Sequence, residues 1–277
     1  MDERLNIYEE KMKKTPISGV PGDFPAVLHD YIEGTRVYDS SCSPEARVYF
    51  IDSGYYLKTA ARGTLEREYK MAGLFFERGL GVQAVCYVCD DNADWLLTRA
   101  AQGEDLLSLC DRPRILCREF AGAARRLHSL SPDGSPLSAL QELYIEVAEK
   151  LLSAPTDVPN FTPNRITRQL GIDSQASALD ALSPLCSGKL RTDALIHGDM
   201  CLPNLIVGQD GYVTHFIDLG SAGAGDRNLD VYWALWTLDY NLGTPEHTEL
   251  FLDLYGRADV DMTVIRAAAA LEAFGVL

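Results

Sequence analysis

The sequence predicts an α+β protein with two lobes, a small antiparallel-sheet lobe at residues 1–100 and a mostly helical lobe at residues 101–277. In the first third, the runs Val48–Ile51 and Tyr55–Lys58 flank Asp52-Ser53-Gly54, which is a favourable hairpin turn. Helical periodicity dominates the remainder, around one short apolar hairpin. The change falls between Ala100 and Glu104, so we place the lobe boundary there.

One helix is expected in the first lobe, directly after the hairpin. Thr64 suits its N-cap, and Gly79 follows its end, where glycine accepts a left-handed backbone. Apolar residues at helical spacing predict a buried stripe formed by Leu65, Tyr69, Ala72 and Phe76. Two further strands are expected at Val82–Val88 and Trp95–Thr98.

Glu68 lies on the predicted stripe, where an unpaired carboxylate is costly. Lys58, on the neighbouring strand, is the nearest partner in sequence, and Tyr56 shares its strand face. A strand lysine paired with a helix glutamate is the arrangement with which kinases hold nucleotide phosphates. The alternative is a pair of unrelated surface charges, with Tyr56 an ordinary core aromatic.

The second lobe is expected to be built from amphipathic helices. Their periodicity and caps place them at Arg114–Leu130, at Ala139–Leu152, after the cap Asp226, between Pro245 and Gly256, and between Asp261 and Phe274. His128 lies near the end of the first of these helices, where a histidine is favourable to the helix dipole. We therefore assign no catalytic role to His128, and none to His215 or His247.

The most informative polar residues lie in and after the run Leu195-Ile196-His197-Gly198-Asp199-Met200-Cys201-Leu202-Pro203-Asn204. Pro203 keeps this segment from forming a helix, and Asp218 follows a hairpin made by Leu205–Val207 and Tyr212–Ile217. A loop Asp and Asn beside a second Asp suit phosphoryl transfer, because one carboxylate can accept a hydroxyl proton while the other side chains hold magnesium. The alternative is that these are ordinary turn residues.

Composition excludes several classes of protein. Forty acidic against twenty-five basic residues give a net charge of −15, which repels nucleic acid and anionic membranes and permits a cationic substrate. No apolar run approaches the roughly 20 residues of a membrane span, and the first residues lack a signal-peptide pattern, so a cytoplasmic protein is expected. Cys86 and Cys89 are three apart on a predicted strand and lack further ligands, which argues against zinc.

The ordered set of His197, Asp199, Asn204 and Asp218 resembles the catalytic and metal segments of the aminoglycoside phosphotransferases, a branch of the protein-kinase-like superfamily. The run from His197 to Asp230 is similar to the 3′-phosphotransferases in particular. The resemblance implies a bilobal protein-kinase-like fold, with ATP or GTP as donor and Mg²⁺ as cofactor. It also implies a cationic small-molecule acceptor that is phosphorylated on a hydroxyl, the 3′-hydroxyl of an aminoglycoside.

The resemblance assigns a role to each matching residue. Asp199 would be the base, and Asn204 and Asp218 the magnesium ligands. His197 and Asp230 would support the catalytic loop, although Asp230 could instead be an exposed first-turn carboxylate. The nucleotide would contact Ser43, Tyr56, Lys58 (set by Glu68), and the backbone of Arg99 and Ala101.

Three departures concern Ser43 and the acceptor. Ser43 stands five residues before Val48, one more than the family pattern. Glu272 matches a C-terminal acidic position that would bind substrate, but its neighbour is Leu271 and the chain continues past Phe274. The segment Asn160–Arg165 contains no acid. The alternatives are therefore a kinase of a non-antibiotic alcohol, amino alcohol or sugar, a nucleotide-binding pseudokinase that acts as an interaction module, and, more distantly, a metal hydrolase.

Overall fold

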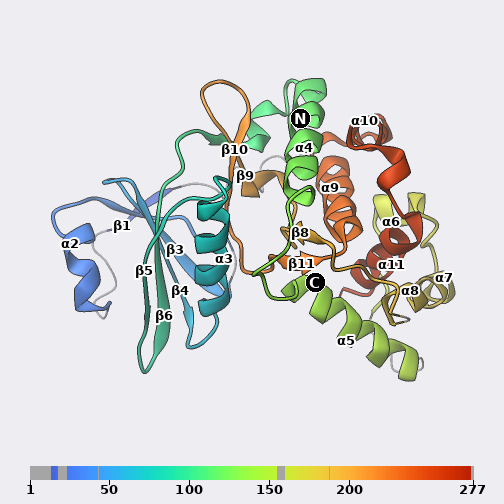
Figure 1. The fold of residues 1–277 in the computed structure, drawn as a ribbon, viewed down its shortest axis with the longest axis horizontal. Coiled ribbons are helices and arrows are strands. Elements are labelled where there is room, and N and C mark those ends of the chain that lie inside the picture. The colour runs from blue at the N-terminus through green and yellow to red at the C-terminus, as the bar shows by residue number, and fades with distance from the viewer. Residues whose placement is uncertain (1–13, 18–23, 43, 155–159, 187, 276–277) are drawn as a thin grey trace. The chain divides into compact units, whose positions relative to one another are not determined.

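The computed structural model describes residues 14–17, 24–42, 44–154, 160–186 and 188–275 (Figure 1). The chain forms two compact units. The first comprises residues 1–103 together with Thr214–Gly220, and the second comprises Glu104–Val213 and Ser221–Leu277. The segment that leads to Asp218 therefore belongs to the first unit although it is distant in sequence.

The first unit is built on a six-stranded antiparallel sheet with the order β1-β2-β3-β4-β6-β5. Its strands are β1 (Thr15–Ile17), β2 (Val37–Asp39), β3 (Ala46–Ile51), β4 (Tyr55–Ala61), β5 (Ala84–Cys89) and β6 (Ala93–Arg99). Its helical elements are η1 (Ala26–Leu28), α2 (His29–Ile32) and α3 (Glu66–Glu77). The predicted hairpin is confirmed: the Gly54 N–H donates to the Ile51 carbonyl at 2.9 Å, with Gly54 at φ 96°.

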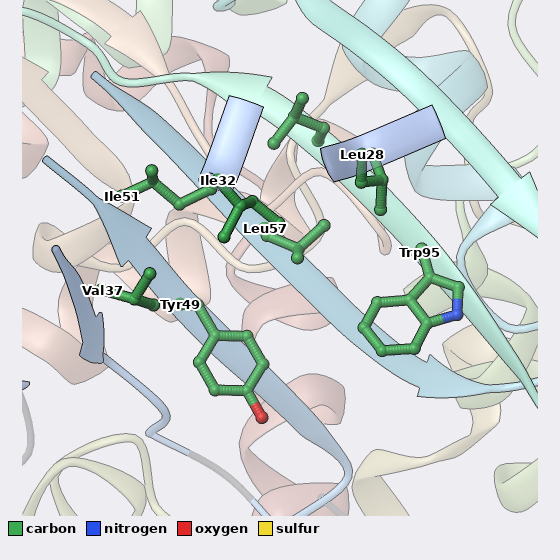
Figure 2. Close-up of a cluster of buried hydrophobic side chains, with 8 residues drawn as sticks. Leu28, Ile32, Val37, Tyr49, Ile51, Leu57 and Trp95 are labelled. Atoms are coloured by element: carbon green, nitrogen blue, oxygen red, sulfur yellow. The ribbon is translucent and has the colours of Figure 1, made fainter. Parts of the chain in front are cut away.

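One face of this sheet forms a hydrophobic core beneath η1 and α2. Figure 2 shows Leu28 and Ile32 over side chains from the strands, among them Tyr49, Leu57 and Trp95. Leu28 and Leu57 are fully buried. Because side chains alternate along a strand, the neighbours of these residues, including Tyr56 and Lys58, lie on the opposite face.

The buried stripe of α3 differs from the prediction. Glu68, Met71, Ala72 and Phe75 are buried, whereas Tyr69 and Phe76 are 38% and 50% exposed. The helix begins at Glu66, so Leu65 is its N-cap and does not set the helical phase. Glu68 and Ala72 are buried as expected, but the stripe runs through Met71 and Phe75, so Tyr69 and Phe76 lie beside it.

The predicted N-cap at Thr64 is also wrong. The Thr64 hydroxyl donates to the Ala61 carbonyl, and the start of α3 is held instead by Asp94 from β6. The Asp94 carboxylate is fully buried and accepts from the Leu65 N–H at 2.9 Å and the Tyr87 hydroxyl at 3.1 Å. Burial alone would raise the pKa of Asp94, but these donors lower it below its ordinary value.

The second unit is mostly helical. Its helices are η2 (Leu106–Leu109), α4 (Pro113–His128), α5 (Ala139–Ser153), α6 (Arg165–Gln169), α7 (Gln175–Ala181), α8 (Ser183–Cys186), η3 (Leu202–Asn204), α9 (Arg227–Leu242), α10 (Pro245–Tyr255), η4 (Arg257–Asp259) and α11 (Met262–Ala273). Its strands are β7 (Glu104–Asp105), β8 (Ala194–Ile196), β9 (Leu205–Val207) and β11 (Gly223–Gly225), and β10 (Val213–Phe216) crosses the division between the units. The predicted α+β class is confirmed.

Two small sheets position the polar loops of this unit. β11 pairs antiparallel with β8, which brings Gly223 opposite Ile196, directly before His197. β9 lies between β10 and β7, and the Gly208 N–H donates to the Tyr212 carbonyl at 2.9 Å in the predicted hairpin. Within the described residues, no helix has the length and apolar content that crossing a membrane requires.

Candidate active site

A three-residue ion cluster lies on the face of the first unit's sheet opposite the core beneath η1 and α2. The Lys58 Nζ atom is 2.8 Å from Glu68 Oε2 and 2.7 Å from Asp218 Oδ1. The predicted pairing of the strand lysine with the helix glutamate is therefore present. Burial alone would lower the pKa of Lys58, but the two carboxylates outweigh it and raise the pKa above its ordinary value. Lys58 therefore remains a cation at any physiological pH.

Asp218 reaches this cluster through an anchored segment of backbone. The Phe216 N–H donates to the Leu80 carbonyl at 2.7 Å, and the Phe216 ring contacts Phe75 of α3. Asp218 then adopts φ 58°, the only positive φ of a non-glycine residue in the part of the chain that the structure describes. Its carboxylate is 52% exposed, so this segment presents a charged oxygen group to solvent beside Lys58.

The structure describes three of the four other residues that we expect to contact a nucleotide. Tyr56 shares the face of Lys58 and lies against Phe50, with ring centroids 5.1 Å apart. The Arg99 N–H donates to the Gln83 carbonyl at 2.9 Å, so this group is already hydrogen-bonded within the first unit. Ala101 is partly buried beyond the end of β6. Ser43 lies outside the described residues.

In the second unit, Asp199 and Asn204 form a compact pair. The Asn204 amide nitrogen donates to the Asp199 carbonyl at 2.9 Å and to Asp199 Oδ2 at 2.8 Å. The turn closes through the Cys201 N–H to the Asp199 carbonyl, and η3 contains Asn204 at its end. Because the amide nitrogen faces Asp199, the Asn204 side-chain oxygen is the atom that could bind a cation.

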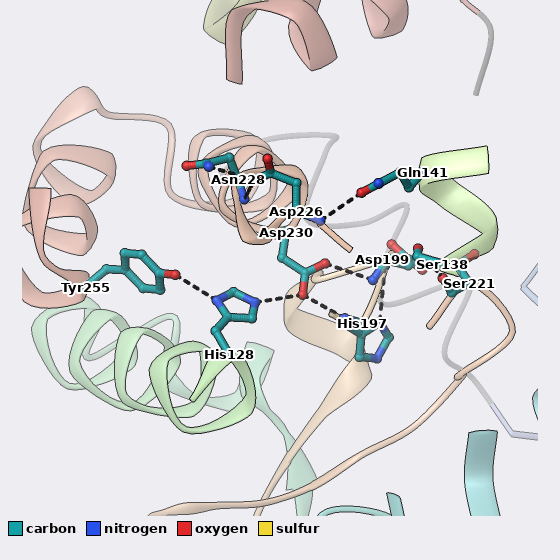
Figure 3. Close-up of polar contacts among 11 residues, drawn as sticks. His128, Ser138, Gln141, His197, Asp199, Ser221, Asp226, Asn228, Asp230 and Tyr255 are labelled. Atoms are coloured by element: carbon teal, nitrogen blue, oxygen red, sulfur yellow. Dashed lines mark hydrogen bonds and ion pairs between the residues drawn. The ribbon is translucent and has the colours of Figure 1, made fainter. Parts of the chain in front are cut away.

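A buried carboxylate holds the backbone that precedes Asp199. Asp230, which is fully buried, accepts from the His197 N–H at 2.7 Å and from the Gly198 N–H at 2.8 Å. The Asp199 N–H in turn donates to His197 Nδ1 at 3.2 Å. Asp230 belongs to α9, and Figure 3 shows its carboxylate between His128 and the backbone of this loop. The arrangement rules out the alternative that Asp230 is an exposed first-turn carboxylate.

The sequence interpretation missed the second layer of this network. His128 is buried, with its Nε2 atom 3.0 Å from Asp230 Oδ2 and its Nδ1 atom 2.8 Å from the Tyr255 hydroxyl (Figure 3). A carboxylate only accepts, so Nε2 carries a proton and Nδ1 can accept from Tyr255. The helix-dipole role proposed for His128 was therefore incomplete. His128 is buried because the end of α4 packs against α10. No local sequence pattern predicts that contact.

Gly198 is required by the shape of this loop. It has φ 78°, and a Cβ atom there would overlap the carbonyl oxygen of Ser221 and lie 2.8 Å from the Ser221 side chain. The Ser138 hydroxyl donates to the same Ser221 carbonyl at 2.7 Å. The backbone after β8 is therefore held closely against the segment before β11.

Asp199 faces a small cavity of about 280 Å³ within the second unit. The cavity lining is largely apolar: besides Asp199 it includes Gly198, Ser221, Leu140, Leu143 and Trp233. Leu143 is 38% exposed at its edge. A ligand that presents a hydroxyl to Asp199 from this side would therefore place an apolar surface against α5 and α9.

Glu272 lies elsewhere in this unit and is half-buried. The Asn164 side-chain amide donates to Glu272 Oε1 and Oε2 at 3.0 Å each. Burial raises the pKa of Glu272 above its ordinary value. The adjacent Arg165 donates to both oxygens of Asp239, at 2.8 and 3.0 Å. The Asn160–Arg165 segment thus binds two carboxylates that could otherwise attract an amine.

Each unit contains a side chain whose chemistry suits magnesium. Asp218 supplies a carboxylate and Asn204 an amide oxygen, both hard oxygen ligands of the kind that Mg²⁺ prefers. Nowhere in the described residues do three His, Cys, Asp or Glu side chains gather to form a site made of protein alone.

These features together define a kinase-like phosphotransferase. Residues 43–271 match the model of the phosphotransferase enzyme family, so the chain belongs to that family. It is 38% identical over 256 residues to a probable aminoglycoside 3′-phosphotransferase of Lactococcus lactis, covering 91% of this chain and 95% of the relative. An aminoglycoside 3′-phosphotransferase of Niallia circulans is 30% identical over 201 residues, covering 70% and 73%.

Solved structures bear out the protein-kinase-like fold. An aminoglycoside phosphotransferase of Streptomyces rimosus superposes with a TM-score of 0.63 at 22% identity, covering 98% of this chain and 95% of that one. An aminoglycoside 3′-phosphotransferase of type VIII gives a TM-score of 0.60, also at 22% identity, covering 99% and 98%. The expected fold is therefore confirmed.

Proposed function

We propose that the protein transfers the γ-phosphate of ATP or GTP to a hydroxyl of an aminoglycoside, the 3′-hydroxyl, in the cytoplasm. The observation that carries phosphoryl transfer is Lys58 held between Glu68 and Asp218, within 2.8 Å of both. This places one fixed cation beside one exposed carboxylate, as required to bind a magnesium-loaded triphosphate. Relatives at 38% and 30% identity named as aminoglycoside 3′-phosphotransferases support the acceptor.

In this proposal each polar residue has a defined task. Lys58 neutralises phosphate oxygens, and Glu68 holds Lys58 in place. Asp218 and Asn204 bind Mg²⁺, which when bound offsets the charge of the transferring phosphates. Asp199, fixed by the Asn204 amide at 2.8 Å, accepts a hydrogen bond from the acceptor hydroxyl and takes its proton.

The remaining tasks concern binding and loop shape. Tyr56 stacks on the base, and the backbone of Arg99 and Ala101 binds its edge. Asp230 and His197 hold the catalytic loop through the backbone contacts of 2.7 to 3.2 Å. Glu272 attracts an ammonium group of the acceptor. Structures of an aminoglycoside phosphotransferase of Streptomyces rimosus in complex with ADP and streptomycin, and of another enzyme of this fold with GDP and kanamycin, support a nucleotide donor.

A second candidate is a kinase of a smaller, less cationic alcohol. Two features favour it: the cavity beside Asp199 is apolar, and Arg165 forms an ion pair with Asp239. Both reduce the electrostatic attraction for a polyamine. The pseudokinase alternative is weakened because Lys58, Glu68, Asp199, Asn204 and Asp218 are all present in bonded arrangements.

The test is nucleoside diphosphate release, measured with ATP and with GTP over a panel of aminoglycosides and small alcohols, with mass spectrometry of the products. We expect 2-deoxystreptamine aminoglycosides with a 3′-hydroxyl to be phosphorylated and 3′-deoxy members to be inert. Asp199→Asn should lower kcat by about 10²-fold or more while nucleotide affinity changes little. Turnover with a simple alcohol alone would favour the second candidate, and wild-type kcat in Asp199→Asn would remove Asp199 from the chemistry.

A further inference from the structure

The face of the first unit's sheet opposite the core beneath η1 and α2 carries a row of aromatic rings. Tyr38 on β2 pairs with Phe50 on β3, which pairs with Tyr56 on β4. The Tyr38 and Phe50 ring centroids are 6.0 Å apart, and those of Phe50 and Tyr56 are 5.1 Å apart. Lys58 lies two residues after Tyr56 and therefore on the same face.

A second lysine reaches this face from the edge of the sheet that β1 forms. β1 pairs with β2, with Thr15 opposite Asp39 and Pro16 opposite Tyr38. Lys14 therefore shares the face of Pro16 and Tyr38. Its ammonium lies 3.4 Å from the centroid of the Phe50 ring and 5.5 Å from that of Tyr56.

Lys14 and Lys58 project at the same level of the sheet. Thr15 pairs with Asp39 in antiparallel strands, so the preceding residue Lys14 lies opposite Ser40. The Ser40 N–H donates to the Val48 carbonyl at 2.8 Å. Val48 pairs with Lys58. Three strand spacings, about 14 Å, therefore separate the two backbones. Two long side chains on one face at this separation can meet opposite parts of a single extended anion.

The two lysines differ in their ion pairs. Lys58 is bound by Glu68 and Asp218, whereas Lys14 makes no ion pair with any carboxylate among the residues that the structure describes. An exposed ammonium over an aromatic ring gains only weak electrostatic stabilisation. A phosphate oxygen is a stronger partner, because both groups of that hydrogen bond are charged.

We propose that Lys14 is a further nucleotide-binding residue, which contacts the phosphate chain of the bound nucleoside triphosphate while the base stacks beside it. The proposal rests on the proposed function, since it requires nucleotide to bind on this face. It gives the N-terminal strand β1 a role: the strand carries a second cation to the site and holds it by backbone pairing with β2.

The test compares three variants with the wild-type protein by calorimetry, using the non-hydrolysable triphosphate AMP-PNP with magnesium. Lys14→Gln should weaken binding by about fivefold, and Lys14→Arg should retain affinity within about twofold. Lys70→Gln is the matched control, because Lys70 is an exposed lysine of the same unit that pairs with Glu66 on α3. It should leave AMP-PNP affinity unchanged.

A second measurement separates phosphate contact from support of the aromatic face. Adenosine, which has no phosphate, should bind wild type and Lys14→Gln equally in a competition assay, and the unfolding midpoints should agree. The proposal is overturned if Lys14→Gln binds AMP-PNP as tightly as wild type or more tightly, or loses adenosine affinity by the same factor. If folded wild type binds no nucleotide, the proposed function itself fails, which is a distinct outcome.

Discussion

The Nε2 atom of His128 lies 3.0 Å from the Oδ2 atom of Asp230, and the two side chains are only 2% and 0% exposed. The same carboxylate accepts the N–H groups of His197 and Gly198. Asp230 is thereby bonded on one side to the loop that carries Asp199, and on the other to α4. A buried carboxylate with fewer donors would be costly, so each donor contributes to holding the loop.

We predict that His128→Ala destabilises the protein by about 2–4 kcal/mol, because it leaves a cavity and removes one donor from Asp230. It should also lower kcat, since the loop before Asp199 loses part of its support. Tyr255→Phe is the matched control: it removes only the outer hydroxyl and should cost about 1 kcal/mol with kcat unchanged. Urea unfolding and steady-state kinetics give both quantities. A His128→Ala variant that is less stable but has wild-type kcat would limit the network to a structural role.

Two glycines provide a paired test of the loop geometry. Gly198 has φ 78° and no room for a Cβ atom beside Ser221, whereas Gly122 lies in α4 with nothing within 4 Å of such an atom. Gly198→Ala should therefore abolish most activity and destabilise the fold by about 2 kcal/mol or more. Gly122→Ala should stabilise it by about 0.5–1 kcal/mol with no loss of kcat. Thermal unfolding and turnover of both variants would check this, and an active Gly198→Ala enzyme would contradict the assigned loop conformation.

The two proposed magnesium ligands, Asp218 and Asn204, should contribute unequally to magnesium-dependent nucleotide affinity. Asp218→Ala removes a charged ligand and one partner of Lys58, and should weaken magnesium-dependent AMP-PNP binding by about 10-fold or more. Asn204→Ala removes a neutral ligand and should have a smaller effect. Asp218→Asn keeps the side-chain size and one oxygen ligand. Its loss of AMP-PNP affinity should lie between those of Asp218→Ala and Asn204→Ala. Calorimetry with and without magnesium isolates the metal-dependent part. Equal loss in magnesium-free buffer would mean that Asp218 serves only to orient Lys58.

The sequence was sufficient for features that depend on local order. The turn at Gly54, the hairpin before Asp218 and the pairing of Lys58 with Glu68 all follow from alternation, turn residues and the cost of a buried carboxylate. The roles assigned to these residues stay predictions until the variants are measured.

Features that depend on tertiary contacts were not predictable. Asp94 holds the start of α3 from a strand 29 positions away, so the local candidate Thr64 was wrong. His128 becomes a network residue only because α9 and α10 bring Asp230 and Tyr255 to it. Lys14 reaches the aromatic face through pairing with β2, which its neighbouring residues do not indicate.

The last prediction concerns the acceptor and Glu272. Its carboxylate receives the Asn164 amide on both oxygens and is partly buried, which raises its pKa. If it attracts an ammonium group of the acceptor, Glu272→Ala should raise the acceptor KM by about 5–10-fold with a smaller change in kcat. Glu272→Gln is the matched variant, because it keeps the shape and loses only the charge. The acceptor KM of Glu272→Gln should be raised nearly as much as that of Glu272→Ala.

The pH dependence of acceptor binding gives an independent check. Because burial raises the pKa of Glu272, its carboxylate takes up a proton at a higher pH than an ordinary glutamate. The wild-type acceptor KM should therefore rise as the pH falls toward that pKa, whereas the KM of Glu272→Gln should not respond to this group. A Glu272→Gln enzyme with wild-type KM, together with a destabilised Glu272→Ala, would show that Glu272 only ties α11 to Asn164. The acceptor would then be recognised mainly by the apolar cavity beside Asp199, and the smaller-alcohol kinase would become the better description.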